Sequence, residues 1–260
     1  MMTATQAFDS DGVDIAFLDA GPHGDRPPVL LIHGFASNLA TNWVATGWVD
    51  LLVKSGRRTI AFDNRGHGAS AKLYELADYG APLMAEDARR LLDSLGIERA
   101  HVVGYSMGSR IAAFLTLAHP SRVESVVFGG LGINMVRGMA GTGPIAHALE
   151  AASIDDVTNP TARTFRAFAE QTKSDLKALA ACIRSARAPL TAEMVGAIRC
   201  PTLIAVGERD VIAGSGEALA DLIPNARAIT LEGRDHMKAV GDKTFKAEAL
   251  AFFEQVDATR

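Results

Sequence analysis

Short apolar segments rich in valine, isoleucine and leucine alternate along this chain with longer segments of helical periodicity, which leaves few folds open to it. From residue 29 onward the short segments are almost continuously apolar, as expected for parallel strands that are buried on both faces. Strand, helix and strand in repetition predict an α/β protein with a mostly parallel, doubly wound sheet and right-handed crossovers. The predicted strands are residues 13–18, 29–32, 59–62, 101–105, 123–128, 202–206 and 228–231.

The segments between these strands predict helices. In residues 82–95, apolar side chains share one face, and polar side chains that include Asp87 are expected to face away from it. Gly96 follows, as expected for the glycine just beyond a helix C-terminus. The other helices predicted between or after the strands are residues 42–55, 107–118, 216–222 and 243–255.

The alternation is interrupted once, between residues 134 and 196. No strand is predicted there, and alanine-rich helical stretches dominate at residues 146–152, 161–172 and 175–185. We interpret the segment as a helical insertion that is too small to be an independent domain. Residues 1–133 and 197–260 are then the core, and residues 134–196 are a helical cap. The alternative is that these stretches are further core helices.

The composition excludes several classes of protein. Lysine and arginine total 26 against 30 aspartate and glutamate, a net charge of −4, and there is no basic block of the kind that binds nucleic acid. Hydrophobic residues make up 48% of the chain, which excludes disorder as its overall state. No stretch approaches the ~18 consecutive apolar residues of a membrane span, and the first residues do not resemble a signal peptide. We therefore expect a cytoplasmic protein with neither a nucleic acid nor a membrane as its partner.

The two cysteines, Cys182 and Cys200, cannot form a disulfide framework or supply a cysteine-rich zinc site on their own. Both are expected to be buried or half-buried thiols in a reducing compartment. No metal site and no cofactor are predicted.

The pentapeptide Gly-Tyr-Ser-Met-Gly at residues 104–108 matches the pattern G-x-S-x-G, between a predicted strand and a predicted helix. In this setting a tight turn strains the backbone of the serine, and the two glycines relieve crowding against the adjoining chain. The Ser106 hydroxyl would lie at the carboxyl end of the strands and at a helix N-terminus, which favours developing negative charge. We predict that Ser106 is a nucleophile rather than a simple helix cap. Ser215, which no strand precedes, is expected only to cap a helix.

A serine hydroxyl needs a base, usually a histidine that a carboxylate orients. Of the seven histidines, His236 follows the last predicted strand and directly precedes the final helix. This places it at the same edge of the sheet as Ser106. The other six start a strand, end a helix, lie in the insertion, or occupy polar or glycine-flanked turns. His236 is therefore the predicted base.

Two loops are the usual places for an acid that precedes His236 in the chain. The loop after the last strand before the insertion contains no carboxylate, whereas the loop after the next strand contains Glu208 and Asp210. Asp210 lies farther past the strand end, where a loop can turn it toward His236, and Glu208 is expected to face solvent. Asp235 is adjacent to His236, and successive side chains generally diverge. Asp210 is therefore the predicted acid.

An acyl-transfer site also needs two backbone N–H groups that point at the forming oxyanion. One is predicted at Met107, the residue after the nucleophile. The other is predicted at Phe35, in the turn that follows the strand at residues 29–32, where Gly34 gives the backbone the freedom to turn this N–H inward. The Phe35 side chain is expected to form a wall of the pocket.

Taken together, these elements resemble the α/β-hydrolase superfamily over nearly the whole chain. The residues that carry the resemblance are 33–35 (His-Gly-Phe), 63–70, 104–108, 207–210 and 235–236. The resemblance implies the α/β-hydrolase fold, with a small helical cap inserted after the sixth strand. It also implies that residues 63–70 are the structural loop after the fourth strand, so that neither Asp63 nor His67 is catalytic.

Departures from the family patterns narrow the activity. A serine at position 106 argues against haloalkane dehalogenases and epoxide hydrolases, because that branch uses an aspartate nucleophile. Relatives that hydrolyse carbon–carbon bonds typically have asparagine before the nucleophile and two glycines after the methionine. Here Tyr105 precedes Ser106, and Gly108 is followed by Ser109, which weakens that alternative.

The sequence thus predicts a cofactor-independent serine hydrolase that cleaves a small carboxylic ester, thioester or lactone. Carbon–carbon hydrolysis or peracid formation on the same triad is one alternative, and a small-molecule receptor that keeps the triad with slow turnover is another. The substrate is expected to bind beneath the insertion, with Phe35, Tyr105 and Met135 as candidate pocket residues. The sequence leaves the oligomeric state open.

Overall fold

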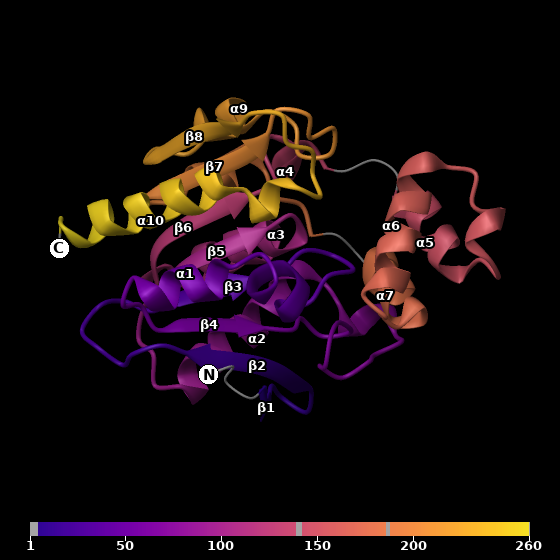
Figure 1. Ribbon diagram of the computed structural model, residues 1–260, viewed down its shortest axis with the longest axis horizontal. Coiled ribbons are helices and arrows are strands. Elements are labelled where there is room, and N and C mark those ends of the chain that lie inside the picture. The colour runs from indigo at the N-terminus through magenta and orange to yellow at the C-terminus, as the bar shows by residue number, and fades with distance from the viewer. Residues whose placement is uncertain (1–4, 139–141, 186–187, 260) are drawn as a thin grey trace.

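The computed structural model describes residues 5–138, 142–185 and 188–259 (Figure 1). These residues form one eight-stranded sheet with the order β1-β2-β4-β3-β5-β6-β7-β8. The pairs β1/β2 and β2/β4 are antiparallel, and all other neighbours are parallel. The strands are β1 (Gln6–Asp9), β2 (Asp14–Ala20), β3 (Val29–Ile32), β4 (Thr59–Phe62), β5 (Ala100–Tyr105), β6 (Val123–Gly129), β7 (Thr202–Gly207) and β8 (Ala226–Leu231). The mostly parallel sheet and all seven predicted strands are confirmed.

Helices cover both faces of the sheet because alternate residues of each buried strand point to opposite sides. Leu30 and Val102 pack with α2, α3, α8 and α9 on one face. Leu31 and Val103 pack with α1 and α10 on the other face. The helices on the sheet are α1 (Trp48–Lys54), α2 (Ala81–Ser94), α3 (Met107–Ala118), α8 (Ala192–Gly196), α9 (Gly216–Ala220) and α10 (Lys243–Asp257).

The described residues between β6 and β7 form helices and loops but no strand. The α-helices are α4 (Asn134–Arg137), α5 (Thr142–Glu150), α6 (Pro160–Gln171), α7 (Leu176–Arg184) and α8, and Ile154–Asp156 form a 3-10 helix. Figure 1 shows α5, α6 and α7 grouped at one side of the sheet, near the ends to which the β5 and β7 arrows point. A separate apolar cluster joins these three helices to Phe35 and Tyr79 of the core. The inserted helical region is confirmed, and its limits at residues 134 and 196 stay a prediction.

Two predictions of secondary structure were wrong. The sequence did not indicate β1, because this edge strand is short and mostly exposed, so it lacks an apolar pattern. The helix predicted at residues 42–55 is two helices, a π-helical turn at Ala40–Val44 and α1. Gly47 separates them with a φ of +79°, a left-handed conformation that a continuous helix cannot contain and that glycine adopts without strain.

Asp87 on α2 does not face solvent as predicted but is 1% exposed. Its two carboxylate oxygens accept hydrogen bonds from Nε and Nη2 of Arg65, both at 2.7 Å. The Ser10 hydroxyl donates a third hydrogen bond to it at 2.6 Å. The helix therefore uses this position to anchor the loop after β4 and the turn after β1, which the helical periodicity alone could not reveal.

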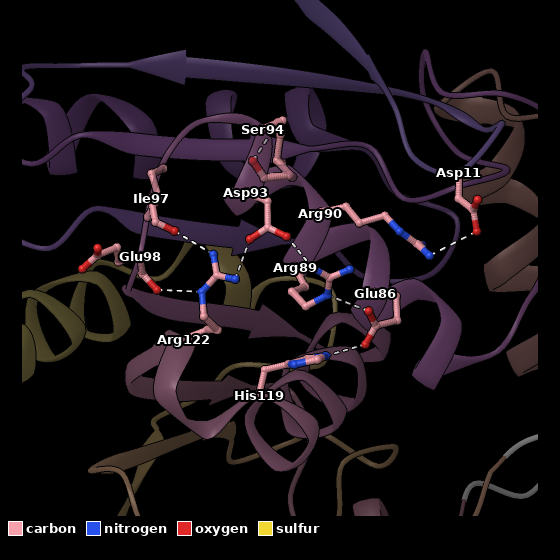
Figure 2. Close-up of polar contacts among 11 residues, drawn as sticks. Asp11, Glu86, Arg89, Arg90, Asp93, Ser94, Ile97, Glu98, His119 and Arg122 are labelled. Carbon is pink, nitrogen blue, oxygen red and sulfur yellow. Dashed lines mark hydrogen bonds and ion pairs between the residues drawn. The ribbon is translucent and has the colours of Figure 1, made fainter.

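The charged side chains of α2 that do reach solvent form a surface network (Figure 2). Arg89 donates to Glu86 at 2.7 Å, and Arg122 donates to Asp93 at 2.6 Å. His119 contacts the other oxygen of Glu86 at 2.5 Å. Exposed pairs of this kind typically contribute at most ~1 kcal/mol each, so the loss of one of them is expected to cost much less than the removal of one partner of the buried pair at Asp87.

We predict that Asp87→Ala lowers the free energy of unfolding by about 3–5 kcal/mol, because it leaves the buried Arg65 guanidinium without its counter-ion. Asp93→Ala on the same helix is the matched control and should cost less than about 1 kcal/mol, since Asp93 is half exposed. Urea unfolding of both variants measures the difference. Equal losses would contradict the assignment of Asp87 as an anchor of the fold.

Candidate active site

Ser106 lies in a strained turn between β5 and α3. Its φ of +54° falls in the left-handed region, which residues other than glycine rarely adopt. A Cβ on Gly104 would lie 2.3 Å from the carbonyl oxygen of Gly108, and a Cβ on Gly108 would lie 2.0 Å from the carbonyl oxygen of Ile32. Both obstructing atoms belong to the backbone, so neither position has room for a side chain. The strain and the role of the glycines are as predicted.

His236 and Asp210 extend from Ser106 as a chain of hydrogen-bonding groups. His236 Nε2 lies 3.0 Å from Ser106 Oγ, and His236 Nδ1 lies 2.7 Å from Asp210 Oδ2. An ionised carboxylate only accepts hydrogen bonds, so the proton of the neutral ring is on Nδ1. Nε2 is then free to accept the proton of the Ser106 hydroxyl. The structure thus brings together the three residues that the sequence singled out.

The carboxylate of Asp210 is itself held in place. Its Oδ1 accepts hydrogen bonds from the backbone N–H groups of Ile212 at 2.9 Å and Ala213 at 3.0 Å. The Asp210 side chain is fully buried, and that of His236 is nearly so. The two backbone N–H groups fix the Asp210 carboxylate. Its hydrogen bond to His236 Nδ1, together with the surrounding packing, therefore sets the orientation of the imidazole ring.

The other carboxylates near His236 accept hydrogen bonds from backbone N–H groups of the loops and do not bond to the imidazole ring. Glu208 is exposed, as predicted, and accepts a hydrogen bond from the backbone N–H of Gly233 at 2.8 Å. Asp235 accepts from the backbone N–H groups of Met237 and Lys238. Ser215 caps α9 through the N–H of Ala218. Among the described residues, Asp210 is the only carboxylate that hydrogen-bonds to the His236 ring.

The turn after β3 lies directly beside the nucleophile. A Cβ on Gly34 would lie 3.2 Å from the Tyr105 carbonyl oxygen and 3.4 Å from the Ser106 Cβ. In the described part of the chain, the backbone N–H groups of Phe35 and Met107 donate to no other group of the protein. The two amides predicted for the oxyanion hole therefore flank Ser106 and are available to a ligand.

Two buried histidines support this turn. Asn64 N–H donates to His33 Nε2 at 2.9 Å, so the His33 proton is on Nδ1, which donates to the Gly34 carbonyl at 2.8 Å. The His67 ring lies against His33, with centroids 5.2 Å apart. Burial lowers the pKa of His33 to about 4, and burial together with the neighbouring His33 lowers that of His67 to about 3. Both rings are neutral structural groups, consistent with a non-catalytic loop at residues 63–70.

Ser106 opens onto two cavities. One, of about 280 Å³, lies among mainly apolar side chains, including Met84, Leu131 and Ile212. The other, of about 560 Å³, contains His236 in its wall together with hydroxyl and amide side chains. Three residues line both cavities, namely Ser106, Phe35 and Phe165. Ser106 and the aromatic pair of Phe35 and Phe165 therefore form the boundary between the two cavities.

The three candidate pocket residues differ in their positions. Phe35 lines both cavities, and its ring lies 6.0 Å from that of Phe165 on α6. Tyr105 lines the larger cavity, and its hydroxyl donates to the His236 carbonyl at 2.5 Å. Met135 lines neither cavity: it lies on α4 with its side chain fully buried in the core cluster, so its assignment to the pocket is corrected.

The sequence does not indicate two residues that line the cavities at Ser106, namely Asn42 and Phe165. Asn42 falls at the start of a predicted helix, and Phe165 lies in a predicted helix of the insertion. The only signal for Asn42 was its position shortly after the His-Gly-Phe turn, and no pattern in the sequence points to Phe165.

No group of three or more histidine, cysteine, aspartate or glutamate side chains with the geometry of a metal site occurs among the described residues. Within the same residues, none of the helices combines the length and the apolar character required to span a bilayer. Cys182 is buried and Cys200 half-buried, as predicted. Burial raises the pKa of the Cys200 thiol to about 11.

Comparisons with known proteins agree with this architecture. A family model described as alpha/beta hydrolase fold matches residues 27–136. The dihydrolipoyllysine-residue acetyltransferase component of the acetoin cleaving system of Cupriavidus necator is 40% identical over 123 residues, which cover 47% of this chain and 31% of that protein. The chain thus spans about a third of the length of this curated relative.

Solved structures match nearly the whole chain. A hydrolase from Pseudomonas aeruginosa PA01 has a TM-score of 0.71 and 26% identity, with coverage of 95% of this chain and 97% of that one. The enol-lactonase from Burkholderia xenovorans LB400 has a TM-score of 0.77 and 22% identity, with coverage of 96% and 100%. Other matches include proteins named as esterases and epoxide hydrolases. These likenesses confirm the predicted fold class.

We predict that Gly108→Ala destabilises the protein by at least about 2 kcal/mol, because the new methyl group would overlap the Ile32 backbone. Gly24→Ala is the control, since Gly24 is exposed and has no atom within 4 Å of its Cβ position other than those of its chain neighbours. This substitution should be neutral or stabilising by up to about 1 kcal/mol. Urea midpoints compare the two, and a Gly108→Ala variant as stable as wild type would refute the packing argument.

We also predict that stability falls as the pH decreases from about 6.5 to about 3. Below pH 6.5 the unfolded chain protonates both histidines, whereas the folded chain keeps His33 neutral down to about pH 4 and His67 neutral down to about pH 3. Because the unfolded state binds more protons, each histidine lowers the free energy of unfolding by a few kcal/mol across this window. His67→Asn, which retains a donor for the Arg65 carbonyl, should reduce the slope. Identical slopes for wild type and variant in urea unfolding at several pH values would contradict this.

Proposed function

This chain belongs to the α/β-hydrolase superfamily, and we propose that it is a serine hydrolase that cleaves a small carboxylic ester, thioester or lactone. The observation that carries the proposal is the continuous contact from Ser106 Oγ through the His236 ring to Asp210, at 3.0 and 2.7 Å. Distances in this range are those required of a nucleophile, its base and the group that orients the base. The turn at Ser106 opens onto two cavities, which provides room on both sides of a bound carbonyl group.

The first half of the reaction forms an acyl-enzyme. Ser106 Oγ attacks the substrate carbonyl carbon while His236 Nε2 takes the hydroxyl proton. The carbonyl π electrons move to oxygen, and the N–H groups of Phe35 and Met107 donate to the resulting oxyanion. When the carbonyl re-forms, the bond to the leaving group breaks, and His236 returns the proton to the leaving alcohol or thiol. Asp210 stabilises the imidazolium that exists between these steps.

The second half releases the acid. His236 Nε2 takes a proton from a water molecule, whose oxygen attacks the acyl carbon. The tetrahedral intermediate uses the same two N–H groups, and it collapses with protonation of Ser106 Oγ by His236. Because Asp210 is buried and receives two backbone N–H bonds, it can hold the ring in one orientation through both halves. All groups for this cycle are side chains and backbone of the described residues.

We predict that Ser106→Ala lowers turnover of a short aryl ester by about 10⁴–10⁶ and that Asp210→Asn lowers it by about 10⁴. The asparagine variant presents an amide donor to Nδ1, so the ring adopts the wrong tautomer. Glu208→Gln is the matched control and should retain near-wild-type turnover, because among the described residues the Glu208 side chain hydrogen-bonds to the Gly233 N–H and not to His236. Steady-state hydrolysis of the aryl ester measures all three.

A fluorophosphonate probe tests the nucleophile directly. We expect one adduct per chain by intact-protein mass in wild type and none in Ser106→Ala. Full esterase turnover in purified Ser106→Ala would rule out the mechanism. No adduct in wild type would mean that Ser106 is not activated and would favour the receptor alternative instead.

A further inference from the structure

Two separate cavities meet at Ser106. They share Ser106, Phe35 and Phe165, and otherwise their walls come from different elements. The smaller cavity, of about 280 Å³, is lined mainly from α2, α3, α4 and α7. The larger cavity, of about 560 Å³, is lined mainly from residues 37–46, α6 and the segment between β8 and α10. A substrate that reacts at Ser106 can therefore extend into two spaces at once.

The fold holds the boundary between the cavities in place. Phe165 is buried on α6, with its ring 6.0 Å from that of Phe35. Arg166, the next residue, donates to a backbone carbonyl of α5 at 2.6 Å. At the C-terminal end of α6, Thr172 Oγ1 lies 2.9 Å from the carbonyl oxygen of Ala36, which follows Phe35 in the turn after β3. The helix that carries Phe165 is thus attached both to the insertion and to the core.

The proton transfer in the proposed reaction decides which half of the substrate enters which cavity. His236 must lie against the oxygen or sulfur of the leaving group in order to protonate it. His236 lines the larger cavity and does not line the smaller one. The leaving alcohol or thiol therefore extends into the larger cavity, and the acyl chain extends into the smaller one.

The wall of the smaller cavity suits an alkyl chain. It consists mainly of apolar side chains, among them Met84, Leu131 and Ile212. Two arginines are the exceptions: Arg110 donates to two backbone carbonyls, and Arg137 is exposed. Each methylene group that an acyl chain buries there is expected to raise kcat/KM by up to about fourfold. The rate should therefore increase with acyl-chain length until the cavity is full.

An open-chain ester has the shape that a divided site requires. Open-chain esters adopt the Z conformation, in which the acyl chain and the alcohol carbon lie anti to each other about the bond between the carbonyl carbon and the ester oxygen. The two halves therefore diverge from the reacting carbonyl. A small-ring lactone is forced into the E conformation, which keeps both halves on one side. Such a lactone can occupy only one of the cavities, whereas an open-chain ester or thioester can occupy both.

We propose that the site is specific for open-chain esters or thioesters, with the acyl chain in the smaller cavity, the leaving group in the larger cavity, and Phe35 and Phe165 between them. The proposal rests on the proposed hydrolase function and narrows its substrate class, because it makes small-ring lactones poor substrates.

The first test compares an open-chain ester with a lactone on the wild-type protein. Ethyl butanoate and ε-caprolactone contain the same number of carbon atoms. Each kcat/KM is divided by the rate constant for hydrolysis by hydroxide, since lactones are intrinsically more reactive. We expect the corrected value to be at least about tenfold higher for ethyl butanoate, because only this ester buries groups in both cavities. A lactone that equals or exceeds it overturns the proposal.

The second test narrows each cavity separately with the same substitution. The residues of α6 that line only the larger cavity follow the helical spacing i, i+3, i+4 and i+7, which places them on one face, and they are Thr164, Ala167, Phe168 and Gln171. On α2, Ala81 lines the smaller cavity and shares a face with Met84, three residues later. Ala167→Leu should therefore narrow the larger cavity and Ala81→Leu the smaller one. Leucine is a good helix former, so both helices should be retained.

Wild type and both variants are assayed on methyl acetate, methyl hexanoate and cyclohexylmethyl acetate. The acyl ratio, kcat/KM for methyl hexanoate over methyl acetate, should exceed about ten in wild type. Ala81→Leu should lower this ratio by about tenfold and leave the alcohol ratio, cyclohexylmethyl over methyl acetate, unchanged. Ala167→Leu should lower the alcohol ratio and leave the acyl ratio unchanged. Because each ratio is taken within one variant, a loss of folded protein cancels.

Every outcome bears on the proposal. Exchanged effects, in which Ala81→Leu acts on the alcohol ratio, overturn the assignment of the two cavities. Equal effects of both variants on both ratios, or no effect of either, overturn the division of the site. If the fluorophosphonate adduct still forms at Ser106, these results reject the substrate assignment alone. Absence of hydrolysis of every ester, together with absence of the adduct, rejects the hydrolase function as well.

Discussion

The first turn of α3 lies against the end of β3 with no space between their backbones, and the geometry of the site follows from this contact. A methyl group at Gly108 would come within 2.0 Å of the Ile32 carbonyl oxygen. This close approach brings the helix N-terminus to the strand edge and holds Ser106 at a φ of +54°. In this conformation the Ser106 hydroxyl lies within hydrogen-bonding distance of His236. The same contact places the turn after β3, with the Phe35 N–H, next to Ser106.

The turn after β3 depends on hydrogen bonds from neighbouring buried side chains. His33 Nδ1 holds the Gly34 carbonyl, and Asn42 Oδ1 holds the Gly34 N–H. Asp63 receives the N–H groups of Leu39 and Ala69, both at 2.7 Å, and burial raises its pKa. A layer of buried polar side chains thus fixes the backbone at Gly34. In the proposed reaction, the fixed backbone would let the neighbouring Phe35 amide bind an oxyanion without rearrangement, which is what electrostatic preorganisation requires.

Much of the fold and the candidate triad could be predicted because both depend on local patterns. Buried parallel strands are apolar throughout, and their carboxyl ends share one edge, so Ser106, Asp210 and His236 were placed together from their positions after strands. Asp87 and Asn42 could not be placed in this way. Their burial depends on which distant segment packs over them: Arg65 and Ser10 over Asp87, and the turn at Gly34 over Asn42. Met135 was misplaced for the same reason.

The inserted helices contribute one side of the boundary between the two cavities. Phe165 on α6 meets Phe35 above Ser106, so the boundary between the two cavities is built half from the core and half from the insertion. In the proposed reaction, the triad and the oxyanion amides would fix where the carbonyl lies, and the aromatic pair would divide the remainder of the substrate around it. Phe35 belongs to both groups, because its N–H is a proposed oxyanion donor and its ring is half of the aromatic pair, whereas Phe165 belongs to the insertion alone. A substitution of Phe165 on α6 is therefore expected to alter which ester is accepted without moving Ser106, His236 or Asp210.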